Sequence, residues 1–333
     1  MTSMKEILRY LAGVAGPSGF GSNSTAEQVT EDCSCLVPSQ LTAIITGATS
    51  GIGAETARVL AKRGIRVVIA ARDLKKGGEV KERIQKESPR AEIVLLEINL
   101  SSFASIKRFC SQFLSLGLPL NILINNAGKY SKNLEFSEDK IEMTFATNYL
   151  GHFLLIEMLL DKMEETATQT DIEGRIINVS SVIHSWVRRD EFCFNDMLNP
   201  NNFNGTRAYA QSKLANILHA KEIANKLKAR NSRVTINAVH PGIVKTGIMS
   251  DHKGFITDLI FFLASKLLKT TSQGASTTCY VALSRQINGV NGKYFIDCNE
   301  SHCSSLANDE SEAKRLWEQT HEFIHSILCQ LTI

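Results

Sequence analysis

The most constraining feature of the chain is a glycine-rich segment, residues 46–53 with the sequence TGATSGIG. An apolar run, residues 41–46, precedes it, and residues 54–61 follow with apolar side chains at helical spacing, which predicts strand, tight turn and helix. Glycine reaches backbone angles closed to other residues and lets the backbone approach a pyrophosphate, which the free N–H groups of the helix N-terminus attract. The segment therefore predicts a nucleotide-binding βα unit, although its Gly-x-x-x-Gly-x-Gly spacing is not the commonest fingerprint.

The rest of the chain alternates apolar strand patterns with helical patterns, which is typical of a parallel sheet covered on both faces. Further strands are predicted at 66–71, 92–96, 120–124, 175–179 and 234–239, and helices at 102–113, 141–162 and 209–227. We predict an α/β, doubly wound parallel sheet (Rossmann fold) in a single domain over residues 41–300. A flexible N-terminal extension, 1–40, precedes it, and a C-terminal helical tail, 301–333, docks on the core or on a partner.

Composition limits the function classes. The 333 residues are 43% hydrophobic and 21% charged with a net charge of +3, which is typical of a globular domain and gives no argument for nucleic acid as a partner. Eight cysteines show no metal-ligand spacing, so we expect reduced thiols in an intracellular compartment and no metal. Residues 1–40 have neither a secretory h-region nor a membrane-spanning run, and their acidic residues disfavour a cleaved transit peptide.

A tyrosine and a lysine lie one helical turn apart, at Tyr209 and Lys213, and so project from the same helix face. A free phenol titrates near pH ~10, so proton transfer near neutrality requires about 3 units, or roughly 4 kcal/mol, of charge stabilisation. The ammonium of Lys213 is suited to supply part of it. An isolated pair of this kind is commonly an ordinary surface pair, so its interpretation depends on what surrounds it.

Five segments occur in the order found in the short-chain dehydrogenase/reductase family. They are residues 46–53, Asn125-Asn126-Ala127-Gly128, Ser180-Ser181, residues 209–213 and Pro241-Gly242. The chain resembles a classical member of this family from about residue 41 to about residue 295. Residues 142–148, 152–155 and 212–216 are similar to the retinol-dehydrogenase-like branch, and most of all to its plant members, which include a chloroplast-envelope dehydrogenase associated with protein import and the Forever Young oxidoreductase group.

The resemblance implies a catalytic set. Tyr209 would be the proton donor or acceptor, and Lys213 would hold the nicotinamide ribose while making Tyr209 more acidic. Ser181 would hydrogen-bond the substrate oxygen, since the family's serine ends its strand, with the neighbouring Ser180 as the alternative. Asn148 would support a proton-relay water near the lysine.

The resemblance also implies a set of cofactor contacts. It comprises Gly47, Thr49, Ser50, Gly51, Ile52, Gly53, Arg72, Asn99, Leu100, Asn126, Ala127, Gly128, Tyr209, Lys213, Pro241, Gly242, Ile243 and Thr246. Asn99 stands where many relatives present an aspartate to the adenine amino group, and its amide oxygen can still accept that bond.

Cofactor choice is indicated at the end of the second predicted strand. NAD-binding units place an acidic residue there for the ribose 2′-OH, whereas this chain has Ala71. Arg72 follows, and a guanidinium suits a 2′-phosphate through two parallel hydrogen bonds. We therefore predict NADP(H), while Asp73, one residue further on, leaves NAD(H) open.

Two apolar stretches bear on the substrate. Residues 182–208 contain His184, Trp186, Phe192, Phe194 and Phe203, and are expected to roof the active site. Residues 245–270 occupy the place of the family's substrate lid and include an apolar helical pattern at 255–268. That helix is expected to be a lid over an apolar pocket, with a membrane-surface anchor and a subunit contact as alternatives.

The sequence thus predicts an NADP(H)-dependent oxidoreductase that interconverts an apolar small-molecule carbonyl compound and its alcohol by hydride transfer. The alternative is an NADP(H)-sensing regulatory or scaffold protein at an organelle envelope, with peripheral membrane contact and protein partners there. The resemblance allows a chloroplast-envelope location, the cytosol remains open, and secretion is not expected.

Overall fold

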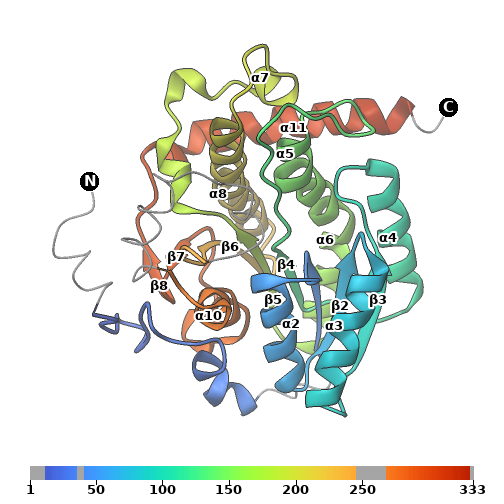
Figure 1. Cartoon of the computed structure of the whole chain (residues 1–333), viewed down its shortest axis with the longest axis vertical. Coiled ribbons are helices and arrows are strands. Elements are labelled where there is room, and N and C mark those ends of the chain that lie inside the picture. Colours follow the sequence, from blue (N-terminus) through green and yellow to red (C-terminus); the bar gives the residue numbers. More distant parts are fainter. Residues whose placement is uncertain (1–11, 36–40, 245–267, 331–333) are drawn as a thin grey trace.

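The fold is built on one eight-stranded sheet (Figure 1). A computed structural model of the chain describes residues 12–35, 41–244 and 268–330. The strands are β1 (Thr42–Thr46), β2 (Arg66–Ala71), β3 (Ile93–Glu97), β4 (Ile122–Asn125), β5 (Gly174–Val179), β6 (Val234–His240), β7 (Tyr294–Ile296) and β8 (Asn299–Ser301). Their order is β3-β2-β1-β4-β5-β6-β7-β8, and all pairs are parallel except the last. The predicted doubly wound parallel sheet is confirmed, with one antiparallel edge strand added.

Helices cover both faces of the sheet (Figure 1). They are α2 (Gly51–Lys62), α3 (Leu74–Glu87), α4 (Phe103–Ser115), α5 (Met143–Phe145), α6 (Gly151–Thr170), α7 (Phe194–Leu198), α8 (Gly205–Ala229), α10 (Thr271–Leu283) and α11 (Glu310–Gln330). One hydrophobic core joins the sheet to α4, α6 and α8, and a second joins it to α2, α3 and α10. Neighbouring residues of one strand face opposite cores, as Ile44 and Ile45 do, which explains why the strands are apolar throughout.

The C-terminal helix α11 lies over the α8 side of the molecule (Figure 1). Its residues Leu316, Thr320 and Ile324 are buried against that core, and the Thr320 hydroxyl lies 2.9 Å from the Tyr149 hydroxyl. Core docking, the first of the two alternatives for this tail, is therefore what the structure shows.

The predicted helix over residues 141–162 contains an irregularity at its amino end. Between α5 and α6 lies a π-helical turn, η3 (Ala146–Leu150), in which the Gly151 N–H donates to the Ala146 carbonyl five residues back. Such turns are rare and occur often at functional sites. Asn148 lies in the middle of this one.

The described part of the N-terminal extension packs against the domain. Ala26 and Thr30 are fully buried, and the Arg63 guanidinium donates to the Glu27 carbonyl and to the Thr30 hydroxyl. Asn299 in β8 accepts a hydrogen bond from the backbone N–H of Ser18. The expectation of a flexible arm is therefore wrong for residues 12–35, because these contacts with distant parts of the chain are not visible in a local glycine- and serine-rich composition.

Most of the predicted lid lies outside the described residues, as do residues 1–11 and 36–40. At its two ends, Val244 and Lys269 form a β-bridge, and the Lys269 N–H donates to the Ile243 carbonyl at 2.8 Å. Lys269 also forms a buried ion pair with Asp297. Within the described parts of the chain, no helix combines the length and apolarity that crossing a membrane requires.

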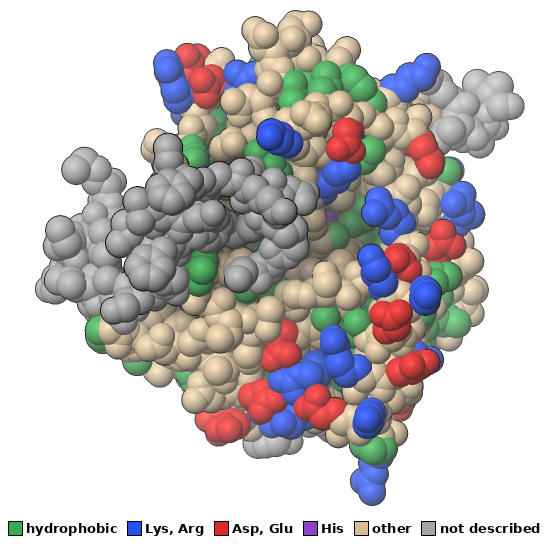
Figure 2. All heavy atoms as spheres, viewed as in Figure 1, with side chains coloured by type: hydrophobic (Ala, Val, Ile, Leu, Met, Phe, Trp, Pro, Cys, Tyr) green, Lys and Arg blue, Asp and Glu red, His purple; other side chains and the backbone are tan. Residues whose placement is uncertain are grey.

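Charged side chains of both signs are interspersed over the face shown in Figure 2. One group of mixed charge in the molecule joins Arg58 to Glu27, Glu55 and Glu87 across the N-terminal extension, α2 and α3. A mixed surface of this kind lacks the single-sign patch by which proteins attract nucleic acid.

Candidate functional site

The turn between β1 and α2 can be formed only with glycine at two of its positions. Gly47 has φ +66°, and a Cβ there would lie 2.7 Å from the Ala127 Cα. At Gly53 a Cβ would lie 2.4 Å from both the Asn126 amide nitrogen and the Gly47 carbonyl oxygen. The turn and the segment after β4 are therefore in direct contact, and the turn is shaped as a phosphate cradle requires.

Thr46, the last residue of β1, holds these two segments together. Its hydroxyl oxygen accepts the N–H groups of Asn126 and Ala127, each at 3.0 Å, and lies 2.9 Å from the His152 Nε2 atom. The Asn126 side chain donates in return to the Thr46 carbonyl at 2.8 Å. Because β1 and β4 are neighbours at which the strand order reverses, this is the topological switch point where open α/β sheets bind ligands.

Tyr209 and Lys213 lie on α8, close to the same edge of the sheet. Lys213 is 3% exposed, and its ammonium donates to the carbonyl of Val179, the last residue of β5, at 3.0 Å. The ammonium lies 5.4 Å from the centroid of the Tyr209 ring, and the Tyr130 ring packs edge-on against Tyr209. The predicted pair is therefore brought together.

Burial shifts the pKa values of the two side chains in opposite directions, because it disfavours the charged form of each. Loss of hydration lowers the pKa of Lys213 to about 8 and raises the pKa of Tyr209 to about 12. The expected acidification of Tyr209 by Lys213 does not outweigh the cost of burying a phenolate. Tyr209 is consequently a protonated phenol at neutral pH.

The two candidate serines differ in environment. The Ser180 hydroxyl is buried and donates to the Lys213 carbonyl at 2.7 Å, so it fastens the end of β5 to α8. Ser181 is half-buried, and among the described residues its hydroxyl makes one long hydrogen bond, accepting the Ile183 N–H at 3.4 Å at the start of η4 (Val182–Trp186). The Ser181 hydroxyl is therefore the one with a proton left to donate.

Asn148 is completely buried, and its side chain is fully engaged. The amide oxygen accepts from the Lys129 N–H at 2.7 Å, and the amide nitrogen donates to the Lys129 carbonyl and to the Ser212 hydroxyl. A Cβ at Gly128 would lie 3.5 Å from the Lys213 ammonium and 3.7 Å from this amide oxygen. Gly128 therefore faces the space that Asn148 and Lys213 both border.

The residues that bear on cofactor choice follow β2. Arg72 is exposed just beyond the end of the strand. Asp73 is the N-cap of α3, and its carboxylate accepts the Lys76 N–H at 3.0 Å, which lowers its pKa. One oxygen of the carboxylate that could serve a ribose 2′-OH is thus bonded to the helix end.

Asn99 and Leu100 follow β3, next to the start of α6. The Asn99 amide oxygen accepts both the N–H and the hydroxyl of Ser101, at 3.2 and 2.8 Å. These two bonds use its lone pairs, so the predicted acceptor for an adenine amino group is already engaged. Leu100 is buried, and its carbonyl oxygen would lie 2.2 Å from a Cβ at Gly151.

The remaining predicted cofactor residues belong to two segments, one after β1 and one after β6. Thr49, Ser50, Gly51 and Ile52 form the end of the glycine-rich turn and the first residues of α2. Pro241, Gly242 and Ile243 follow β6, where Gly242 has φ +88° and Ile243 is exposed. Thr246 lies outside the described residues.

The expected aromatic roof is only partly realised. Phe192 and Phe194 are buried in the core, where the Phe194 ring lies 6.1 Å from Phe145 and 5.9 Å from Phe323 of α11. The prediction that they roof the site is wrong, because α11 provides an apolar surface that the sequence did not place there. Trp186, by contrast, is 68% exposed.

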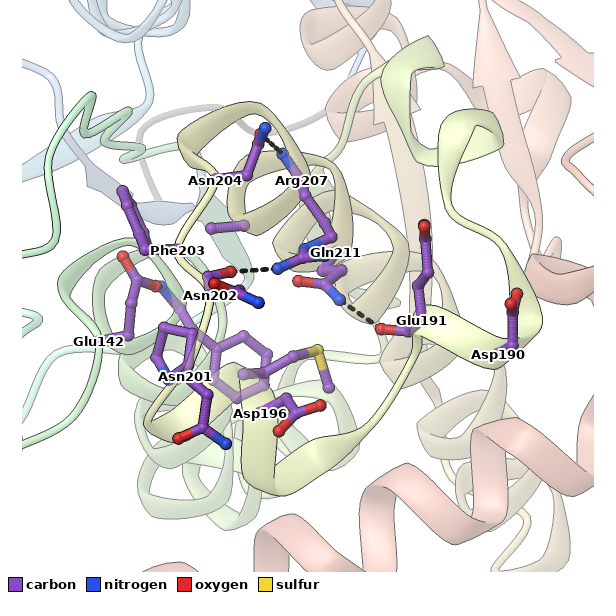
Figure 3. Close-up of a pocket in the computed structure, with 14 residues that line it drawn as sticks. Glu142, Asp190, Glu191, Asp196, Asn201, Asn202, Phe203, Asn204, Arg207 and Gln211 are labelled. Carbon is purple, nitrogen blue, oxygen red and sulfur yellow. Dashed lines mark hydrogen bonds between the residues drawn. The ribbon is translucent and has the colours of Figure 1, made fainter.

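A separate cavity of about 270 Å³ lies between α8, α7 and the loops around α7 (Figure 3). Figure 3 shows Gln211 donating to the Glu191 carbonyl and Arg207 to the Asn202 carbonyl. Tyr209 and Lys213 are not among its lining residues, which are Glu142, Phe145, Asp190, Glu191, Asp196, Met197, Pro200, Asn201, Asn202, Phe203, Asn204, Arg207, Ala208 and Gln211. This cavity is therefore distinct from the predicted catalytic site.

Sequence reasoning missed two buried residues at the site, Thr46 and His152. Both were inside quoted motifs, but neither was assigned a role. The available signal was a polar side chain at a position that the strand or helix pattern assigns to the core, since buried polar groups require partners.

The geometry agrees with what comparisons find. Residues 41–189 match the family model of the short chain dehydrogenases. The chloroplastic short-chain dehydrogenase TIC 32 B of Brassica napus is 46% identical over 97% of this chain and 99% of its own length, and retinol dehydrogenase 12 of Bos taurus is 39% identical over 84% and 85%. A crystal structure of an uncharacterised protein from Mycobacterium paratuberculosis superposes with a TM-score of 0.64 at 29% identity, covering 84% of this chain and 93% of the other.

Proposed function

The chain belongs to the short-chain dehydrogenase/reductase family, and on that premise we propose that it is an NADP(H)-dependent oxidoreductase that interconverts an apolar carbonyl compound and its alcohol. The observation that carries the proposal is the position of a buried Lys213 beside Tyr209, facing Gly128 at the switch point of the sheet. Burying an ammonium without a carboxylate partner costs folding free energy, which favours a functional reason for its position.

The residues present fit a dinucleotide. Gly47 and Gly53 let the turn pack directly against Asn126 and Ala127, next to the amino end of α2, whose free N–H groups would bind a pyrophosphate. Lys213 would hold the nicotinamide ribose, and the nicotinamide, when bound, supplies or takes up the hydride.

The proposed preference for NADP(H) rests on Arg72 and Asp73. Arg72 is exposed at the carboxyl end of β2, where its guanidinium can pair with a 2′-phosphate. Asp73 caps α3 through one carboxylate oxygen, which favours a structural role for it over one in binding a ribose 2′-OH.

Each catalytic residue has a defined task in the proposed reaction. The substrate oxygen would accept a hydrogen bond from the Ser181 hydroxyl and the proton of the Tyr209 phenol. Because desolvation keeps that phenol protonated at neutral pH, Tyr209 would be ready to donate its proton when a carbonyl is reduced. Asn148 and Lys213 border the space through which a proton can return to Tyr209.

The proposed substrate class depends on exposed apolar side chains after β5 and β6. Val182 and Trp186 follow Ser181, and Ile243 follows Gly242; all three are exposed although they are apolar. Side chains of this kind near a reaction centre favour an apolar substrate over a sugar.

The test is NADPH oxidation by the purified protein with a panel of apolar aldehydes and ketones, with NADH in parallel. We expect Tyr209→Phe to lower turnover at least about 100-fold while NADPH affinity stays within about twofold. Arg72→Ala should raise the KM for NADPH about tenfold and leave that for NADH unchanged. Full turnover by the Tyr209→Phe protein would exclude the mechanism, and tight NADPH binding without turnover would favour a regulatory or scaffold role.

We propose a chloroplast location, in keeping with the chloroplastic relatives from Brassica napus. A fluorescent fusion of the full chain, expressed in leaf cells and compared with envelope and cytosolic markers, tests it. Fluorescence confined to the cytosol would refute this location without affecting the proposed reaction.

A further inference from the structure

Resting on the proposed function, we infer that His152 and His184 are positioning residues of the same reaction. Each is a neutral imidazole with its proton on Nδ1, and each holds the backbone carbonyl of a residue in the catalytic set. His152 holds Asn148, and His184 holds Ser181.

His152 connects the π-helical turn to the cofactor cradle. It is 1% exposed, its Nδ1 atom lies 3.1 Å from the Asn148 carbonyl oxygen, and its Nε2 atom lies 2.9 Å from the Thr46 hydroxyl. Thr46 is the residue that also holds the N–H groups of Asn126 and Ala127. One imidazole therefore spans from Asn148 to the junction of β1 and β4.

The hydrogen-bond inventory fixes the tautomer of His152. The Thr46 oxygen has two lone pairs, which accept the Asn126 and Ala127 N–H groups, so its own proton must be donated elsewhere. The His152 Nε2 atom at 2.9 Å is a closer acceptor than the Ile124 carbonyl at 3.4 Å. With Nε2 accepting, the ring proton lies on Nδ1 and is donated to Asn148; the other tautomer would set two acceptors against each other.

His184 shows the same pattern with different partners. Its Nε2 atom accepts the backbone N–H of Ser304 at 3.1 Å, and an N–H can only donate. The ring proton must therefore lie on Nδ1, which is 2.6 Å from the Ser181 carbonyl oxygen. His184 thus ties the segment after β5 to the chain ahead of α11.

Both rings are held without charge. His184 is 3% exposed, and burial lowers the pKa of His152 to about 4 and that of His184 below its usual value. A neutral ring fixes the orientation of a peptide group without placing a positive charge beside the Lys213 ammonium. Because the two rings stay neutral, we assign them to positioning and leave proton transfer to Tyr209.

Fixing the carbonyl groups of Asn148 and Ser181 is important because displacing a catalytic group by about 1 Å can lower the rate about 100-fold. Asn148 lies in a π turn, where the regular helical bonding is interrupted, and Ser181 lies beyond the last hydrogen bond of its strand. Neither backbone position is fixed by regular secondary structure. The imidazoles add a constraint at both positions, at Ser181 together with the His184 backbone N–H, which donates to the same carbonyl at 3.2 Å.

The first experiment reads the tautomers directly, by long-range ¹H–¹⁵N correlation spectra of the full chain labelled with ¹⁵N-histidine at neutral pH. Resonances are assigned with the single variants His152→Phe and His184→Phe. We expect both rings to carry the proton on Nδ1, whereas free histidine prefers Nε2. An Nε2 proton or a charged ring at either position overturns the inference for that residue, whether or not the protein turns over a substrate.

The second experiment separates positioning from stability, with His219→Phe as the matched control. His219 is an equally buried histidine on α8 whose two ring nitrogens have no hydrogen-bond partner in the described part of the chain. At equal folded fraction, His152→Phe and His184→Phe should each lower kcat at least about tenfold with the carbonyl KM within about twofold. His219→Phe should leave both constants within about twofold.

Affinity for NADPH provides a readout that does not need turnover. His152→Phe should weaken it at least about fivefold, through Thr46 and the cradle, whereas His184→Phe and His219→Phe should not change it. Kinetic constants and affinities that match His219→Phe in all respects would overturn the inference. Absence of turnover in the wild type would instead contradict the proposed function, with the tautomers and the NADPH affinity still deciding this inference.

Discussion

Buried neutral histidines make the folded state sensitive to mild acid, and His219 isolates the effect. Burial lowers its pKa from 6.5 to about 3, because the charged ring cannot be hydrated in the core. The ring stacks on Phe153 at 4.8 Å and lies edge-on to Tyr149, and neither nitrogen has a partner among the described residues. Phenylalanine can therefore replace it without breaking a hydrogen bond that the structure shows.

The sign of the effect follows from where protons bind. Above pH 6.5 the ring is neutral in both states and contributes no pH dependence. Below it, the unfolded chain takes up the proton while the folded ring does not, so stability falls by about 1.4 kcal/mol per pH unit until the folded pKa is reached. At pH 5 this amounts to about 2 kcal/mol for each such histidine.

His152 and His240 carry the same penalty, since burial lowers their pKa values to about 4 and about 3. Together with His219 they lower the free energy of unfolding by about 6 kcal/mol between pH 8 and pH 5, whereas its typical total is roughly 5–15 kcal/mol. The carboxyls of buried Glu142 and half-buried Glu157, whose pKa values desolvation raises, act in the opposite direction. A comparison between wild type and a single histidine variant cancels their contribution.

The assay is urea unfolding followed by tryptophan fluorescence at several pH values between 5 and 8. His219→Phe should match the wild type within about 1 kcal/mol at pH 8 and exceed it by about 2 kcal/mol at pH 5. Parallel stability curves for the two proteins across this range would refute the reasoning, because they would show that His219 titrates alike in both states.

Two further predictions concern the site. Gly53→Ala should abolish NADPH binding, measured by calorimetry, because its Cβ would lie 2.4 Å from the Gly47 carbonyl oxygen. The control Gly78→Ala lies in α3, where a Cβ would have nothing within 4 Å. It should bind NADPH normally and be about 1 kcal/mol more stable than the wild type. In steady-state kinetics, the rate of carbonyl reduction should be constant from about pH 6 to about pH 7.5 and should fall above about pH 8, because Lys213 loses its proton. Alcohol oxidation needs the phenolate of Tyr209, so its rate should rise with pH up to about pH 8. A reduction rate that rises with pH would contradict both assignments.

The central sheet was predictable because its strands are buried on both faces. Such strands are apolar throughout and are bounded by turns, and the strand predicted at 66–71 is β2 without change. The candidate residues that follow β1, β4, β5 and β6 gather at one edge of the sheet, because parallel strands bring their carboxyl ends together. Their roles in catalysis and cofactor binding remain predictions.

Other elements depend on contacts that local patterns do not carry. The β7–β8 hairpin turns at Asp297 and Cys298, both with positive φ, whereas such turns usually have Asn-Gly. Asp297 is held there by its ion pair with Lys269, a residue far away in sequence. The π turn at 146–150 likewise has the composition of an ordinary helix.

The balance between desolvation and charge at Tyr209 decides whether its phenol or its phenolate predominates at neutral pH. Ionising a phenol with a pKa of about 12 at pH 7 costs roughly 7 kcal/mol. An ammonium 5.4 Å from the ring returns only about 3 kcal/mol at an effective dielectric constant of about 20. Lys213 alone therefore cannot populate the phenolate, so in the proposed reaction Tyr209 would meet a carbonyl substrate as an acid, and alcohol oxidation would need further positive charge at the site.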